Sequence, residues 1–263
     1  MSFNPQKCSV LRVTNKKRQV ESQYTMCGVV LTLSNQETYL GLELTSNMSW
    51  GAHINKITAK SNRSLNMIRR NLGFSSEDIK KNAYQALVRP SLEYAHTVWD
   101  PYQANHINQV ERIQRKAVRF IKGNYDREAS VTAMRCELQL PTLQERRCVA
   151  RLAMFRKVVT GTTAVRLPDY IEQPTRELRH HHHQTYINPQ TQINSYQYSF
   201  FPRTIRCWNL LPCTITVAPS QDAFQSHLWK AIDTGQITVA RPRDAYMRPR
   251  LGSSSQQQPT VVY

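Results

Sequence analysis

Residues 104–122 read ANHINQVERIQRKAVRFIK, and this stretch decides the fold because it carries two opposite faces at helical spacing. At about 100° per residue, one side collects six apolar residues: Ile107, Val110, Ile113, Ala117, Phe120 and Ile121. The other side collects five cations: Arg112, Arg115, Lys116, Arg119 and Lys122. Glu111, at the edge, is the one acid near them. We predict a helix whose apolar face lies on a core and whose cationic face meets a polyanion or open water.

The positive charge of the chain is concentrated around this helix. The formal net charge is +17, and residues 51–161 supply +11 of it, with 20 Lys and Arg against 9 Asp and Glu. Basic helix faces suit the phosphate backbone of nucleic acid. The alternatives are a solvated basic surface and a cationic helix at a membrane surface. Nucleic acid is favoured because the cations lie on a helix face and not in a tail.

The rest of the chain predicts an α+β fold that is mainly α. Short β-branched segments at 8–14, 24–33 and 38–44 predict a small antiparallel sheet. Helical periodicity follows at 53–72, from Ile79 to Val88, and at 142–160. Beyond Leu167 the pattern dissolves, apart from the aromatic-rich stretch 198–212 and a short helix at 222–232.

We therefore divide the chain into four regions. They are a sheet at 1–50, a basic helical bundle at 51–161, a largely irregular C-terminal extension with an aromatic cluster at 162–239, and a disordered tail at 240–263. No apolar run approaches the roughly 18 residues of a transmembrane helix, so no membrane partner is expected.

No catalytic or metal-binding residues are predicted. The six cysteines form no C-x-x-C pair, which argues against a zinc finger or disulfide framework and favours reduced, intracellular thiols, nuclear or cytoplasmic. The run from His180 to His183 is interpreted as an exposed polar loop, because metal ligands usually converge from separated positions. A Gly-rich phosphate loop and a nucleophile elbow are both lacking. Asp100 is interpreted as a helix cap or turn former.

Six segments, taken together, resemble a known family. They are FNPQKCSVLRVT at 3–14, TYLGLELTSNMSWGAHI at 38–54, RRNL at 69–72, ALVRPSLEYAHTVWDPY at 86–102, ERIQRKAVRFI at 111–121 and YSFFPRTIRCWNLLP at 198–212. In this order they resemble the C-terminal part of the reverse transcriptase of non-LTR (LINE-type) retrotransposons of animals. The resemblance covers roughly residues 1–232.

The resemblance implies roles for several residues. Residues 1–50 would be the end of the polymerase palm, where Lys7 matches the motif D lysine, which is thought to assist pyrophosphate departure. Tyr39, Leu40 and Gly41 match the primer-grip turn, although Thr38 stands where the family commonly has lysine. Residues 51–161 would be the thumb, which grips the RNA or DNA template–primer duplex.

The same resemblance places the metal-binding aspartates of the family upstream of Lys7. We therefore expect a binding fragment without polymerase activity of its own, with no cofactor in this chain and Mg²⁺ only in the intact polymerase. One alternative is a non-functional relic or a structural or interaction protein derived from a retroelement. Another is polymerase activity only when upstream domains complete the enzyme. For the binding fragment, we expect Arg112, Arg115, Lys116, Arg119 and Lys122 to contact phosphates.

Overall fold

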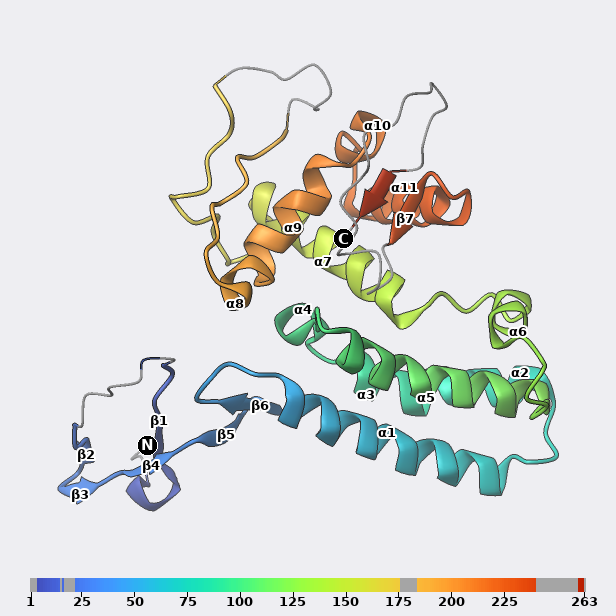
Figure 1. The fold of residues 1–263 in the computed structure, drawn as a ribbon, viewed down its shortest axis with the longest axis horizontal. Coiled ribbons are helices and arrows are strands. Elements are labelled where there is room, and N and C mark those ends of the chain that lie inside the picture. Colours follow the sequence, from blue (N-terminus) through green and yellow to red (C-terminus); the bar gives the residue numbers. More distant parts are fainter. Residues whose placement is uncertain (1–3, 15, 17–21, 176–183, 240–259, 263) are drawn as a thin grey trace.

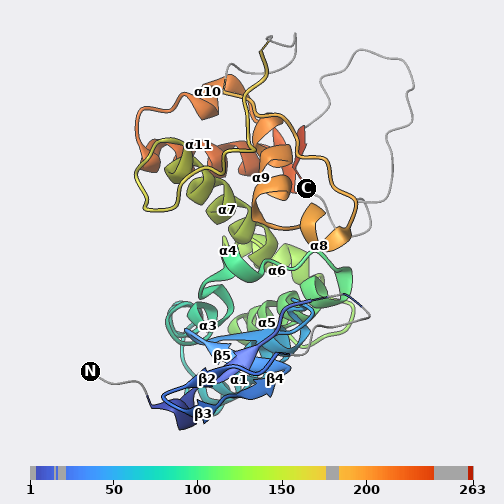
Figure 2. The same cartoon turned by 90° about the vertical axis from the view of Figure 1, so that its left-hand side faces the viewer.

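The structure is a computed structural model that describes residues 4–14, 16, 22–175, 184–239 and 260–262. Helices contain more than half of the described residues and the sheets are small, which confirms the mainly α, α+β class. N-terminal β-ribbons, a helical bundle and a second helical group follow one another in space (Figures 1 and 2). The run from His180 to His183 and nearly all of the predicted tail lie outside the described residues.

The N-terminal region forms two-stranded ribbons where one antiparallel sheet was predicted. After a 3₁₀ turn, η1 (Pro5–Lys7), it contains β1 (Ser9–Leu11), β2 (Thr25–Met26), β3 (Val29–Val30), β4 (Thr32–Ser34), β5 (Gln36–Tyr39) and β6 (Leu42–Thr45). Strands β2–β3 and β5–β6 pair antiparallel, whereas β1 pairs with β4 in parallel. Strands of only two to four residues cannot build one continuous ladder, so the region stays divided.

The β5–β6 hairpin is fastened to the bundle through β6. Leu42 and Glu43 are buried there, and the backbone N–H of Glu43 donates to Nδ1 of His53, 3.3 Å away. The Glu43 carboxylate forms an ion pair with Lys56 of the first helix. Hydrogen bonds from Lys56, Thr38 and Gln36 lower the pKa of Glu43 to about 2, so this link is ionised at neutral pH.

The helical bundle contains the predicted basic helix. Its elements are α1 (Gly51–Asn71), α2 (Glu77–Ala83), the π-helical turn η2 (Tyr84–Val88), α3 (Arg89–Glu93), α4 (His96–Trp99), α5 (Ala104–Lys122) and α6 (Val131–Glu137). All six apolar residues predicted for the inner face of α5 are buried, as is Gln114. Five of these apolar residues, all except Ile107, belong to one hydrophobic cluster with the inner faces of α1, η2 and α3. The apolar stripe therefore places α5 as the sequence predicts.

Helices α1 and α5 run side by side in the same direction. Gln109 donates to Asn55 over 2.8 Å, and Lys116 donates to Asn62 over 3.2 Å. Both pairs are separated by the same 54 positions, so the two helices stay in register along their length. Figure 1 shows α1 and α5 as neighbouring rods, with α1 below α5. Their exposed faces therefore form one surface.

A second core occupies the C-terminal half and is more ordered than predicted. It is built by α7 (Leu143–Val159), α8 (Asn194–Gln197), α9 (Phe200–Asn209), α10 (Cys213–Thr216), α11 (Gln221–Asp233) and the parallel pair β7 (Ile237–Val239) and β8 (Thr260–Val262). Phe155, Trp208 and Phe224 pack ring against ring at its centre. Local periodicity missed this core because its aromatic residues come from three separate helices.

Helix α7 begins as predicted but packs differently from the prediction. Thr142 and Glu145 form the expected capping box. From Cys148 onward, however, the buried apolar residues of α7 belong to the second core. The division between the two cores therefore falls near the start of α7, and not at residue 161.

A buried charge cluster joins the two cores, and here the interpretation of Asp100 as a simple cap or turn former was incomplete. Asp100, which follows α4, forms ion pairs with Arg147 and Arg151 of α7 and with Arg203 of α9. Burial opposes ionisation of Asp100, but the charges of Arg203, Arg151 and Arg147 outweigh it and lower the pKa of the carboxyl. We name Asp100, Arg147, Arg151 and Arg203 the arginine cluster.

Candidate nucleic-acid interface

The five cations predicted as contacts share one helix but not one environment. Arg112, Arg115 and Lys116 are exposed, whereas Arg119 and Lys122 are half-buried. Lys116 lies beside α1, where it bonds to Asn62. Arg115 lies on another side of α5, in a hollow that it lines with Glu111 and Arg135. The structure therefore brings only part of the predicted set to the surface shared with α1.

Lys122 is held by two acids from neighbouring elements. Its Nζ lies 3.1 Å from Glu77 of α2 and 3.2 Å from Glu137 of α6. Hydrogen bonds to Glu77 and then Glu137 raise the pKa of Lys122. The expectation that Lys122 is an open phosphate contact is therefore revised, because its charge is already compensated within the fold.

Arg119 shapes a loop as well as carrying charge. Its guanidinium donates to the backbone carbonyls of Asp126 and Ala129, so it fixes the turn that follows α5. That turn leaves the helix through Gly123, whose φ of +63° lies in the left-handed region that favours glycine. This loop also contains Tyr125, whose side chain is 54% exposed.

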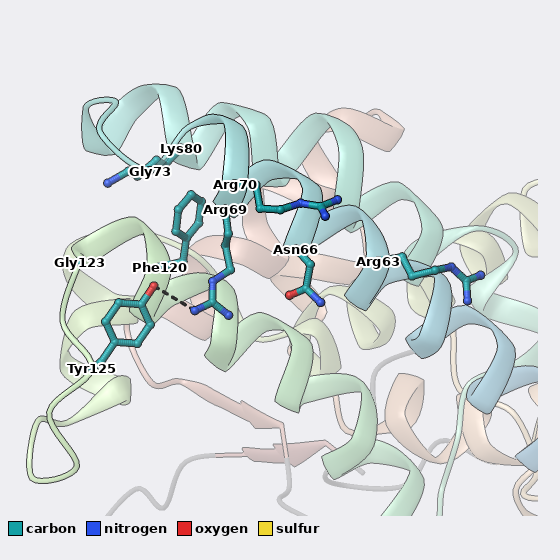
Figure 3. Close-up of a pocket in the computed structure, with 9 residues that line it drawn as sticks. All are labelled: Arg63, Asn66, Arg69, Arg70, Gly73, Lys80, Phe120, Gly123 and Tyr125. Carbon is teal, nitrogen blue, oxygen red and sulfur yellow. Dashed lines mark hydrogen bonds between the residues drawn. The ribbon is translucent and has the colours of Figure 1, made fainter.

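A groove between α1, α2 and the end of α5 is rich in positive charge (Figure 3). We name it the basic groove. Its volume is about 950 Å³, and its lining includes four cations: Arg63, Arg69 and Arg70 of α1 and Lys80 of α2. None of the described residues that line it carries a carboxylate.

Most of the positive charge of the basic groove comes from helix α1. Its 21 residues contain five Lys and Arg but no Asp or Glu. Lys60, Arg63, Arg69 and Arg70 are exposed, and none of them forms an ion pair with an acid in the part of the chain that the structure describes. Lys56 differs, because Glu43 neutralises it. The C-terminal half of α1 therefore keeps its charge available.

Two aromatic rings hold cations in the basic groove. The guanidinium of Arg69 lies 5.5 Å from the ring centre of Tyr125, and its Nη2 donates to Tyr125 Oη over 3.4 Å (Figure 3). The ammonium of Lys80 lies 5.3 Å from the ring centre of Phe120. Such contacts keep a cation in place without neutralising it. The groove is therefore partly preorganised for an anion.

The residues matched to polymerase motifs lie in the N-terminal region. Lys7 is exposed at the end of η1. Tyr39, Leu40 and Gly41 form the tight turn between β5 and β6, with φ of +48° at Leu40 and +82° at Gly41. The hydroxyl of Tyr94 donates to the Leu40 carbonyl over 3.0 Å, so the bundle supports this turn. Tyr39 and Leu40 point largely into solvent.

The sequence-based prediction selected cations of α5 as contacts and did not include those of α1. The sequence feature that could have identified them is the absence of Asp and Glu from α1. The net charge summed over 51–161 hides this feature, because that range includes acids from other segments. No sequence feature identifies Lys80, because its position in the groove depends on the packing of α2 against Phe120 of α5.

Within the described ranges, no group of three or more His, Cys, Asp or Glu side chains is arranged to hold a metal ion. None of the described helices is long and apolar enough to cross a membrane. Comparisons with known protein families, with curated proteins and with solved structures returned no match.

Proposed function

We propose that this chain binds the phosphate backbone of nucleic acid on the surface shared by α1 and α5. The observation that carries the proposal is the basic groove of about 950 Å³, whose described lining residues include four cations and no carboxylate. Arg112 and Lys116 extend the charge along α5. Cations on such a surface neutralise phosphates and release the counterions condensed on the nucleic acid, which gives affinity without regard to base sequence.

The side chains around the groove favour backbone contacts. Arginine presents several donors in a plane and pairs well with phosphate oxygens. Tyr125 adds an exposed aromatic ring beside Arg69, which suits stacking on a terminal or unpaired base. We therefore propose an RNA or DNA duplex, including a template–primer duplex, as the ligand, bound with little sequence preference.

We also propose that the chain represents the palm end and thumb of a non-LTR retrotransposon reverse transcriptase. Support comes from the order of the six matching segments and from the tight turn at Tyr39, Leu40 and Gly41, which precedes a basic helical bundle. In this proposal the described residues bind the duplex. Synthesis, and the Mg²⁺ that it needs, belong to the intact polymerase.

A charge-matched comparison tests the binding surface. The variant Arg63→Gln, Arg69→Gln, Arg70→Gln removes three charges from the groove and its edge. The control Lys157→Gln, Arg166→Gln, Lys230→Gln removes three exposed charges from the second core or its adjoining loop. For a short duplex at fixed salt, fluorescence anisotropy should show affinity falling roughly 10- to 100-fold for the groove variant. The control should change it by less than about threefold. An equal loss of duplex affinity in the two variants would refute binding through the basic groove.

A structural or interaction role is the second candidate, and the N-terminal ribbons favour it. Val29, Val30, Leu33, Tyr39 and Leu40 are all exposed there. Exposed apolar residues on short edge strands promote association with other chains. Size-exclusion chromatography with light scattering distinguishes the two roles. Self-association abolished by Val29→Lys with Leu33→Lys, with no binding of duplex, would favour the interaction role over nucleic-acid binding.

A further inference from the structure

The arginine cluster contains more positive than negative charge. Three guanidinium groups are buried around the single carboxylate of Asp100. The next carboxylate among the described residues is Glu111, 3.9 Å from Arg147, and burial raises the pKa of that carboxyl. Buried charges without compensation are costly, so the cluster favours a further anion.

Two buried thiols lie against this cluster. Cys148 is on α7 and Cys207 is on α9, and both side chains are almost completely enclosed. A single atom, Nη2 of Arg151, lies 3.3 Å from the sulfur of Cys207 and 4.0 Å from the sulfur of Cys148. The two thiols also form a hydrogen bond with each other. Two sulfurs from different helices are therefore held together beside a fixed positive charge.

The surroundings of the two sulfurs shift the pKa values of the two thiols in opposite directions. The hydrogen bond from Cys148, together with the charges of Arg151 and Arg203, lowers the pKa of Cys207 against the effect of burial. The hydrogen bond to Cys207 and burial raise the pKa of Cys148, and the charge of Asp100 adds to this. Of the two thiols, Cys207 is therefore the one that ionises more readily, beside the positive charges of the cluster.

A cavity borders the arginine cluster. It has a volume of about 240 Å³ and is lined in part by Asp100, Arg151 and Arg203. Arg151 therefore has one side in this cavity and another against the sulfur of Cys207. The side chain of Arg151 thus connects the lining of this cavity to the sulfur of Cys207.

We propose that Cys148 and Cys207 are a redox-active pair that a hydroperoxide converts to a disulfide linking α7 to α9. The Cys207 thiolate attacks the outer peroxide oxygen, so that an S–O bond forms and the O–O bond breaks. The leaving oxygen takes up a proton and departs as water or an alcohol. The sulfur of Cys148 then attacks Cys207, loses its proton, and expels hydroxide, which leaves as water. Two thiols and one peroxide thus give one disulfide, one water and one water or alcohol.

Peptide mapping of the full-length chain tests this pair directly. The protein is treated with hydrogen peroxide, its remaining thiols are blocked, and it is digested without reduction. Mass spectrometry should find a peptide pair joined through Cys148 and Cys207, and either Cys148→Ser or Cys207→Ser should abolish it. In Cys148→Ser, dimedone should trap a sulfenic acid at Cys207, because the resolving thiol is missing. Circular dichroism confirms that each variant is folded.

The pH dependence of the rate gives a second readout that needs no substitution. Between about pH 7 and pH 8.5, the disulfide should form at a nearly constant rate, whereas an ordinary cysteine reacts roughly tenfold faster per pH unit below its pKa. Oxidation of the exposed Cys136 serves as the internal control for the delivery of peroxide. The proposal fails if no linked peptide forms while Cys136 is oxidised, or if the sulfenic acid appears at Cys148.

Discussion

Lys116 on α5 donates a hydrogen bond to Asn62 on α1, with 3.2 Å between Nζ and Oδ1. This contact places the cations of α5 beside Arg63, the next residue of α1 and the first cation of the basic groove. The two helices run in the same direction, so their charges extend one surface and do not lie on opposite sides of the bundle. The proposed binding of nucleic acid depends on this continuity.

Lys116 and Lys122 should respond differently to the same substitution. Lys116→Gln removes a charge that no acid compensates among the described residues, whereas Lys122→Gln removes one that Glu77 and Glu137 already share. We expect duplex affinity to fall roughly three- to tenfold for Lys116→Gln and less than about twofold for Lys122→Gln. Anisotropy titrations at low salt measure both. A larger loss for Lys122→Gln would contradict the assignment.

Removing the buried carboxylate should destabilise the junction between the two cores. Asp100→Asn keeps the shape of the side chain but leaves Arg147, Arg151 and Arg203 without their shared partner. The expected loss is about 3–5 kcal/mol in the free energy of unfolding, because the buried guanidinium groups lose compensation. Urea denaturation measures it. A loss below about 1 kcal/mol would show that the cluster is compensated differently.

The same carboxyl predicts the response of stability to acid. Its pKa is lowered in the folded chain, so its contribution is complete above the unfolded value of about 3.9 and is lost as pH falls through the lower folded value. Wild-type stability should therefore decline below about pH 4, and Asp100→Asn should show a shallower decline. Melting temperatures taken across this range compare the two. Parallel curves would exclude Asp100 as a source of the decline.

The turn matched to the primer grip should loosen when its support is removed. Tyr94→Phe deletes the hydrogen bond to the Leu40 carbonyl, at an expected cost of about 0.5–1.5 kcal/mol. Gly41→Ala strains a residue with φ of +82° and brings a methyl group to within 3.5 Å of the Tyr94 ring. Hydrogen exchange should accelerate at residues 39–42 in both variants, while exchange in the second core stays unchanged. Unchanged exchange at the turn would mean that Tyr94 does not support it.

Local sequence patterns correctly predicted the features that depend on residue spacing within a single helix. The apolar stripe of α5 and the capping box of α7 depend on spacings within one helix, and both appear in the structure as expected. Such features need no knowledge of what packs against them.

The parts that the sequence did not predict all join distant segments. Glu77 and Glu137 neutralise Lys122 from two other helices, and this changes which α5 cations are available. Asp100 meets Arg203 across about a hundred residues of chain, so its role could not be deduced from its neighbours Trp99 and Pro101. The second core likewise assembles Trp208 and Phe224 around Phe155 of α7. Tertiary packing, and not local pattern, places these residues.

The salt dependence of duplex binding tests the proposed function most directly. For the wild-type chain, the logarithm of the association constant should fall linearly with the logarithm of salt concentration, with a slope of roughly −0.9 for each phosphate contacted. In Arg63→Gln, Arg69→Gln, Arg70→Gln the slope should become shallower by roughly 0.9 for each cation that contacts a phosphate. The control Lys157→Gln, Arg166→Gln, Lys230→Gln should keep the wild-type slope. Identical slopes in all three proteins would contradict nucleic-acid binding through the basic groove.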